Sequence, residues 1–149
     1  MEVIPNLENF TSVYATGANH LVYTRLAADL DTPVSLMLKL TQAKKNSFML
    51  ESVTGGDVKG RYSIIGMNPD LIWRCDGKTA SINRSVLDNS ETFIDQSEDP
   101  LASLRIVLEE TSIDLPHDLP PMAAGLFGYL GYDMIRLVEH LPNINPDKL

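Results

Sequence analysis

The spacing of turn signals between residues 47 and 83 constrains this fold more than any other feature. Short apolar runs alternate there with a Gly-Gly pair, an Asn-Pro-Asp turn and the hairpin dipeptide Asp76-Gly77. This alternation predicts strands over residues 47–53, 61–65, 71–75 and 78–83. The connections are too short for the crossovers that parallel strands need. We therefore expect an antiparallel meander.

Helical periodicity flanks this meander on both sides. A helix over residues 7–16 is predicted with Asn6 as its cap, and two further helices begin at Thr32-Pro33 and Asp99-Pro100. The last of these has an expected buried stripe of Leu101, Leu104, Val107 and Leu108. The remaining predictions are strands over residues 20–28 and 122–130, a surface excursion over 84–98 and a short helix over 132–140. Helices interspersed with antiparallel strands indicate an α+β fold.

Composition excludes several classes of function. The chain of 149 residues suits one domain, and its net charge of −8 argues against binding to nucleic acid or to an anionic membrane surface. Cys75 is the only cysteine, so the chain forms no internal disulfide and has almost no prospect of a thiolate metal site. The chain has neither a signal-like start nor an apolar run near the ~20 residues that span a bilayer. We expect a cytoplasmic protein.

The glycines do not form a nucleotide-binding loop. Gly55 and Gly60 have Walker A spacing, but Arg61-Tyr62 and a strand follow where a phosphate loop needs Lys, then Ser or Thr, and a helix. Glycines 125, 128 and 131 are spaced by three, which does not fit the dinucleotide fingerprint. Their expected role is to let another backbone or an aromatic ring approach a strand.

No nucleophile and base form a recognisable catalytic set. His20, His117 and His140 lie near the ends of predicted elements, which favours surface or capping roles. The sequence therefore predicts no catalytic residue and no metal ligand in this chain.

One segment has a chemistry that a purely structural role does not fully explain. Glu51 and Ser52 end an apolar strand, and a Gly-Gly loop returns the chain beside them with Arg61 and Tyr62. Burial of an unpaired carboxylate is costly, so Glu51 either pairs with Arg61 or faces a ligand cation. An amino acid suits the second alternative, because its ammonium needs an acceptor and its carboxylate needs donors.

This segment, together with Pro69 and Arg74, resembles the Leu-Glu-Ser … Gly-Arg-Tyr-Ser-x-Ile-Gly … Pro … Arg signature of the anthranilate synthase component I family. A second block over residues 125–133, followed by Glu139 and Leu141-Pro142, is similar to the family's Gly-x-x-Gly-Tyr-x-x-Tyr-Asp … Glu … Leu-Pro run. Aminodeoxychorismate synthase component I shares the second block but usually departs from Glu-Ser and Gly-Arg-Tyr-Ser. The resemblance therefore favours anthranilate synthase.

The resemblance implies that residues 1–149 form the amino-terminal regulatory domain of a longer enzyme. That enzyme converts chorismate to anthranilate and pyruvate with Mg²⁺, using ammonia from a glutamine amidotransferase subunit. Chorismate and Mg²⁺ bind in a carboxy-terminal portion that lies beyond Leu149. The present chain is thus expected to be inactive alone and to bind no cofactor.

The family's feedback site for tryptophan, carried over by position, comprises Leu50, Glu51, Ser52 and Tyr62. Some relatives have lysine where Tyr62 stands. The family fold implies sandwich-like antiparallel sheets with helices packed outside. A severed domain would expose apolar surface, which favours self-association. The alternative from another class is a stand-alone module that binds a small ligand.

Overall fold

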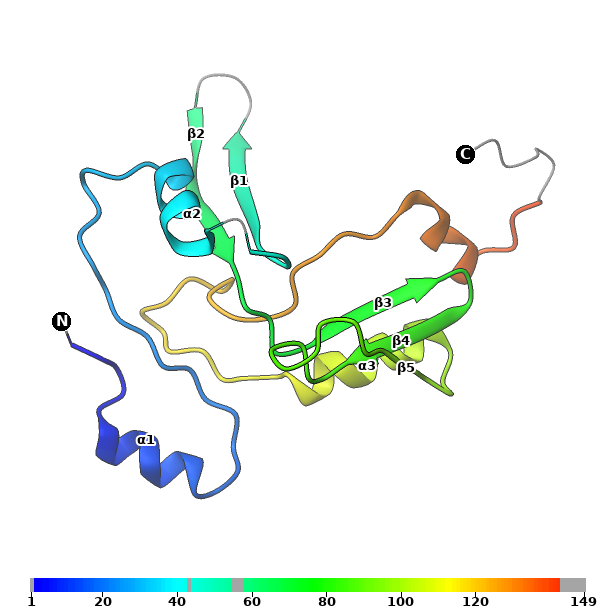
Figure 1. Cartoon of the computed structure of the whole chain (residues 1–149), viewed down its shortest axis with the longest axis horizontal. Coiled ribbons are helices and arrows are strands. Elements are labelled where there is room, and N and C mark those ends of the chain that lie inside the picture. Colours follow the sequence, from blue (N-terminus) through cyan, green and yellow to red (C-terminus); the bar gives the residue numbers. More distant parts are fainter. Residues whose placement is uncertain (1, 43, 55–57, 143–149) are drawn as a thin grey trace. The chain divides into compact units, whose positions relative to one another are not determined.

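The computed structural model describes residues 2–42, 44–54 and 58–142, with side chains except those of residues 53–61 (Figure 1). It contains helices and two small antiparallel sheets, so the predicted α+β class is confirmed. Residues Arg25–Ile72 and Asn83–Phe93 form one compact unit, and Glu2–Thr24, Trp73–Ile82 and the chain from Ile94 onward form another. The sheet of β1 (Phe48–Thr54) and β2 (Val58–Gly66) lies in the first unit. The sheet of β3 (Ile72–Asp76), β4 (Thr79–Asn83) and β5 (Ile94–Asp95) lies mainly in the second.

Helix α2, Pro33–Thr41, begins where Thr32-Pro33 predicts. The Ser35 amide donates to Thr32 Oγ1 at 3.1 Å and the Thr32 amide donates to Ser35 Oγ at 2.9 Å, which satisfies two amides that the helix leaves unpaired. Lys39 Nζ lies 2.6 Å from Asp31 Oδ1. The Lys39 ammonium and the Ser35 hydroxyl lower the pKa of the Asp31 carboxyl. This end of α2 is therefore strongly specified by local polar contacts.

The first antiparallel pair, β1 (Phe48–Thr54) and β2 (Val58–Gly66), confirms the predicted hairpin. Helix α2 packs against β2. The strands are longer than expected, because cross-strand pairing continues to Thr54 and Val58. The prediction of a loop over residues 54–60 is therefore wrong at both of its ends, and residues 55–57 lie outside the described part.

The second sheet confirms the Asp76-Gly77 hairpin, with β3 (Ile72–Asp76), β4 (Thr79–Asn83) and the short β5 (Ile94–Asp95) in that order. Helix α3, Pro100–Glu110, lies along one face of this sheet (Figure 1). Trp73 Nε1 donates to Ser103 Oγ at 3.1 Å and joins β3 to α3. The face toward the helix takes the apolar side chains of β4 by strand alternation.

The buried stripe of α3 differs from the prediction. Val107 is fully buried, but Leu108 is half exposed, and the small residues Pro100 and Ser103 are buried instead. A small side chain lets the helix approach the sheet closely, and the Trp73 indole reaches the Ser103 hydroxyl there. The apolar periodicity alone did not reveal this polar contact.

The surface segment predicted over residues 84–98 is only partly exposed. Asn83 is 1% exposed and Val86 is 7% exposed, and β5 forms within the segment. Asn83 Nδ2 donates to the Asn89 carbonyl at 2.7 Å, and the Ser85 amide donates to Asn83 Oδ1 at 2.8 Å. The sequence of this turn is polar and aperiodic, but the buried side chain of Asn83 holds it in place.

Helix α1, Leu7–Tyr14, confirms the first predicted helix, and the Asn9 amide donates to its cap Asn6 at 2.9 Å. The predicted strand over residues 20–28 is wrong except for a single bridge between Ile4 and Tyr23. No other strand partner for it occurs in the described ranges. A side chain holds the segment instead, as the Thr24 hydroxyl donates to the Glu2 carbonyl at 2.6 Å.

The predicted strand over residues 122–130 is also wrong, because this segment is turns and coil in the structure. A strand requires a hydrogen-bonding neighbour, and none of the described elements pairs with it. Gly125 adopts φ +141°, outside the usual β region. The helix predicted over 132–140 shortens to a 3-10 turn, Tyr132–Leu137, which has no side-chain cap.

Candidate functional site

The four predicted effector residues lie on the β1-β2 hairpin. Leu50 pairs with Ile64 and Glu51 pairs with Ser63, after which the register shifts before Val53 pairs with Lys59. Ser52 therefore occupies the irregularity between two regular stretches. Such irregularities leave backbone groups out of the ladder and redirect nearby side chains. The structure thus brings the predicted residues to one distinctive place.

Strand alternation divides these residues between the two faces of the hairpin. Successive side chains point to opposite faces, so Leu50 shares a face with its partner Ile64 and, two residues along β1, with Ser52. Tyr62 lies in the neighbouring stretch of β2 where the register shifts. Leu50 is 47% and Tyr62 is 37% exposed, and Ser52 is also exposed. We call Leu50, Ser52 and Tyr62 the effector face.

Glu51 lies on the other face, opposite Ser63. Its side chain is exposed, so the premise that its carboxylate is buried is wrong. The side chain of Arg61 lies outside the described residues, and the Glu51–Arg61 pair stays a prediction. The geometry separates the carboxylate from the hydroxyl of Ser52, although the two residues are adjacent in sequence.

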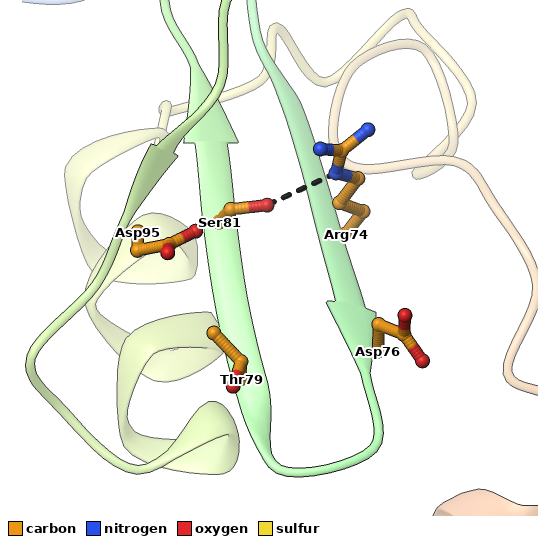
Figure 2. Close-up of a pocket in the computed structure, with 5 residues that line it drawn as sticks. All are labelled: Arg74, Asp76, Thr79, Ser81 and Asp95. Atoms are coloured by element: carbon orange, nitrogen blue, oxygen red, sulfur yellow. Dashed lines mark hydrogen bonds between the residues drawn. The ribbon is translucent and has the colours of Figure 1, made fainter.

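A concave region lies elsewhere, on the sheet β3-β4-β5 (Figure 2). It is a depression of about 460 Å³ on the face that alternation turns away from α3. Arg74 Nε donates to Ser81 Oγ at 3.0 Å across the two strands. Its lining residues are Arg74, Asp76, Thr79, Ser81 and Asp95. The bond between Arg74 and Ser81 accounts for a polar side chain at a buried position.

The prediction that the three histidines have surface or capping roles is confirmed only in part. His117 and His140 are exposed, as expected. His20 is half-buried, its ring centroid lies 5.0 Å from that of Phe10, and its Nε2 atom is buried without a hydrogen-bond partner in the described structure. The position of His20 near the end of a predicted element did not indicate that its ring would be half-buried. The burial comes from a contact with Phe10 of α1, a different element.

Cys75 is half-buried, and its Sγ donates to the Gly77 carbonyl at 3.5 Å. Burial, followed by the nearby carboxylates of Asp76 and Asp99, raises the pKa of this thiol. A raised pKa leaves little thiolate at neutral pH, which opposes nucleophilic chemistry. The described residues contain no group of three metal-ligating side chains, and no helix among them is long and apolar enough to cross a bilayer.

The fold and the hairpin together define an α+β protein whose β1-β2 hairpin exposes polar and apolar side chains. Known proteins identify the family. The chain is 58% identical over 97% of its length to anthranilate synthase component 1 of Cereibacter sphaeroides. It is 38% identical over 95% of its length to that of Pseudomonas putida, and 37% identical over 92% to that of Synechocystis.

The chain belongs to the anthranilate synthase component 1 family and corresponds to the amino-terminal part of these relatives. It spans 29%, 28% and 26% of the three relatives, respectively. No family model matches the chain, and no solved structure is significantly similar to it. The resemblance inferred from the two sequence blocks is confirmed.

Proposed function

We propose that this chain supplies the tryptophan feedback site of an anthranilate synthase that converts chorismate to anthranilate and pyruvate. The proposal is supported by the family and, above all, by the exposed effector face, where Leu50, Ser52 and Tyr62 lie at or beside the register shift of the hairpin. The Ser52 hydroxyl can donate to the effector carboxylate, and Leu50 offers apolar contact to an indole ring.

Feedback would operate through differential affinity. Tryptophan inhibits only if it binds more tightly to the state that turns over chorismate poorly. The chain itself contributes binding rather than chemistry in this proposal. The described residues contain no cluster that fits Mg²⁺, so we derive no step through the metal. The amidotransferase partner likewise belongs to the proposed whole enzyme.

In an enzyme that carries this chain as its amino-terminal part, we expect Ser52→Ala to raise the tryptophan concentration for half-inhibition by about 10- to 100-fold. This range corresponds to the loss of one hydrogen bond to a charged group. Turnover without tryptophan should be retained, because no substrate contact is removed. Steady-state anthranilate fluorescence, measured across a tryptophan titration, gives both quantities.

Ser63→Ala is the matched control, because Ser63 is also an exposed serine of the hairpin but lies on the opposite face. It should change half-inhibition by less than about threefold, which is under 1 kcal/mol. Unchanged inhibition in Ser52→Ala would contradict the site, whereas loss of inhibition in Ser63→Ala alone would assign it to the other face.

The reaction itself is tested by product analysis. The enzyme should release pyruvate in equal amount to anthranilate from chorismate. The aminodeoxychorismate alternative predicts an amination product and no pyruvate at this step. All three relatives named above are anthranilate synthase component 1, which favours the first outcome. A lactate dehydrogenase-coupled assay distinguishes the two.

A further inference from the structure

The two strands of the β1-β2 hairpin run side by side (Figure 1), but they contribute unequal numbers of residues at the register shift. Glu51 pairs with Ser63 on one side of the shift. Val53 pairs with Lys59 on the other side. Between these two pairs lies one residue of β1, whereas β2 has three, residues 60–62. We call this excess of two residues in β2 the strand mismatch.

The strand mismatch makes β2 depart from β1 opposite Ser52, the one β1 residue between the two pairs. Paired positions hold the strands together on both sides, so the longer strand must bulge between them. A regular hairpin would instead place a single β2 residue directly opposite Ser52 and engage the backbone there in the ladder. The space beside Ser52 is therefore set by the length of β2, independently of the side chains of residues 60–62.

The excess is an even number of residues, which is compatible with an unchanged facing of the flanking side chains. Alternation has a period of two, so two extra residues leave Ser63 and Lys59 on the faces that they would have in a regular hairpin. An odd excess would turn one of the two stretches over. Removing the mismatch therefore changes the space beside Ser52 and preserves the faces of the pairs around it.

The strand mismatch lies among the proposed effector residues. Ser52 is opposite the excess, Tyr62 is within it, and Leu50 is two residues away along β1. Ser52 and Tyr62 are exposed, so a ligand can reach the place where β2 departs from β1. The carboxylate and the ammonium of an amino acid need donors and acceptors that a regular ladder would use for cross-strand bonds.

We propose that the strand mismatch, and not the effector side chains alone, enables the hairpin to bind an amino-acid effector. The effector carboxylate occupies the space beside Ser52 that a cross-strand neighbour takes in a regular hairpin. This inference rests on the proposed feedback function, and it adds the backbone feature on which the site depends.

In an enzyme that carries this chain as its amino-terminal part, two variants equalise the strands by opposite routes. One lacks Gly60 and Arg61, and the other has two alanines inserted after Ser52. We expect each to raise the tryptophan concentration for half-inhibition at least about tenfold, the effect of one lost hydrogen bond to a charged group. Arg61→Ala is the matched control, because it preserves the length of β2, and it should change half-inhibition by less than about threefold.

Hydrogen exchange tests the strand mismatch without tryptophan. The amides of residues 50–53 should exchange more slowly in both equalised variants than in the wild type, because a regular ladder engages the backbone on either side of Ser52. Unchanged exchange in both variants would overturn the proposal, since β2 would then not have been held away from β1. Faster exchange together with lost inhibition would also contradict it, because the strands would have separated.

Wild-type half-inhibition in a folded equalised variant would overturn the proposal, as would an Arg61→Ala variant that loses as much inhibition as the variant without Gly60 and Arg61. The feedback function is tested separately. An enzyme that tryptophan does not inhibit, or that Ser52→Ala leaves unchanged, would contradict the feedback site itself. Turnover without tryptophan shows which variants are folded, and if one equalised variant is not, the other decides the outcome.

Discussion

Replacing Asn83 by alanine is expected to lower the free energy of unfolding by about 2 to 3 kcal/mol, because it removes a buried side chain together with its two hydrogen bonds. The side chain is 1% exposed, and both of its ends are used, one by the Ser85 amide and one by the Asn89 carbonyl. Alanine can replace neither bond. Urea titration followed by far-ultraviolet circular dichroism measures the change.

Asn89→Ala is the matched control in the same turn. Asn89 is exposed, and its side chain accepts one bond from the Glu91 amide at 3.1 Å, which water can replace. We expect a loss of less than about 1 kcal/mol, as is usual for exposed substitutions. Equal losses in the two variants would show that burial of Asn83 does not matter to stability.

The second large effect is expected at Gly66, where alanine should cost about 1 to 3 kcal/mol through overpacking. Gly66 is the cross-strand partner of Phe48, and the Phe48 ring lies over it. A Cβ atom at residue 66 would overlap ring carbons Cε1 and Cζ. The ring must therefore move away from β2. The same urea titration measures the loss in the hairpin unit.

A double-mutant cycle identifies the cause of this loss. In the Phe48→Ala background the ring is absent, so Gly66→Ala should cost at least about 1 kcal/mol less than it does in the wild type. Gly128→Ala is the control, because nothing lies within 4 Å of its Cβ position. Additive losses at positions 48 and 66 would contradict the proposed overlap, as would an equal loss at Gly128.

The elements that sequence predicted best are those with local chemical signals at their ends. Thr32-Pro33 and Asp99-Pro100 specify where α2 and α3 begin, because the side chain of the capping residue bonds to an amide two or three residues away. Asp76-Gly77 specifies a hairpin through the positive φ of Gly77, which is +57°. These interactions span only a few residues and need no knowledge of the remaining fold.

The strands predicted over residues 20–28 and 122–130 failed for a common reason. Apolar, β-branched and aromatic residues favour a strand, but a strand exists only when another segment accepts its hydrogen bonds. Tyr23 forms a single backbone bridge, with Ile4, and residues 122–130 belong to none of the described strands.

Sequence also located the candidate site without describing its geometry. It singled out Leu50, Glu51, Ser52 and Tyr62 through their residue types and their resemblance to the family motif, and the hairpin confirms that β1 and β2 are neighbours. The hypothesis that the Glu51 carboxylate and the Ser52 hydroxyl serve one ligand did not consider which face each occupies. Pairing with Ser63 places Glu51 on the opposite face from Ser52.

The sequence by itself determined the family, the α+β class, the starts of α2 and α3 and the two hairpins, because each depends on short motifs or on contacts between neighbouring residues. The tertiary structure alone decided the register of β1 and β2, the burial of Asn83 and the bond from Trp73 to Ser103. These features depend on segments that approach one another only after the chain has folded, and side-chain burial and facing follow from that approach rather than from local propensity.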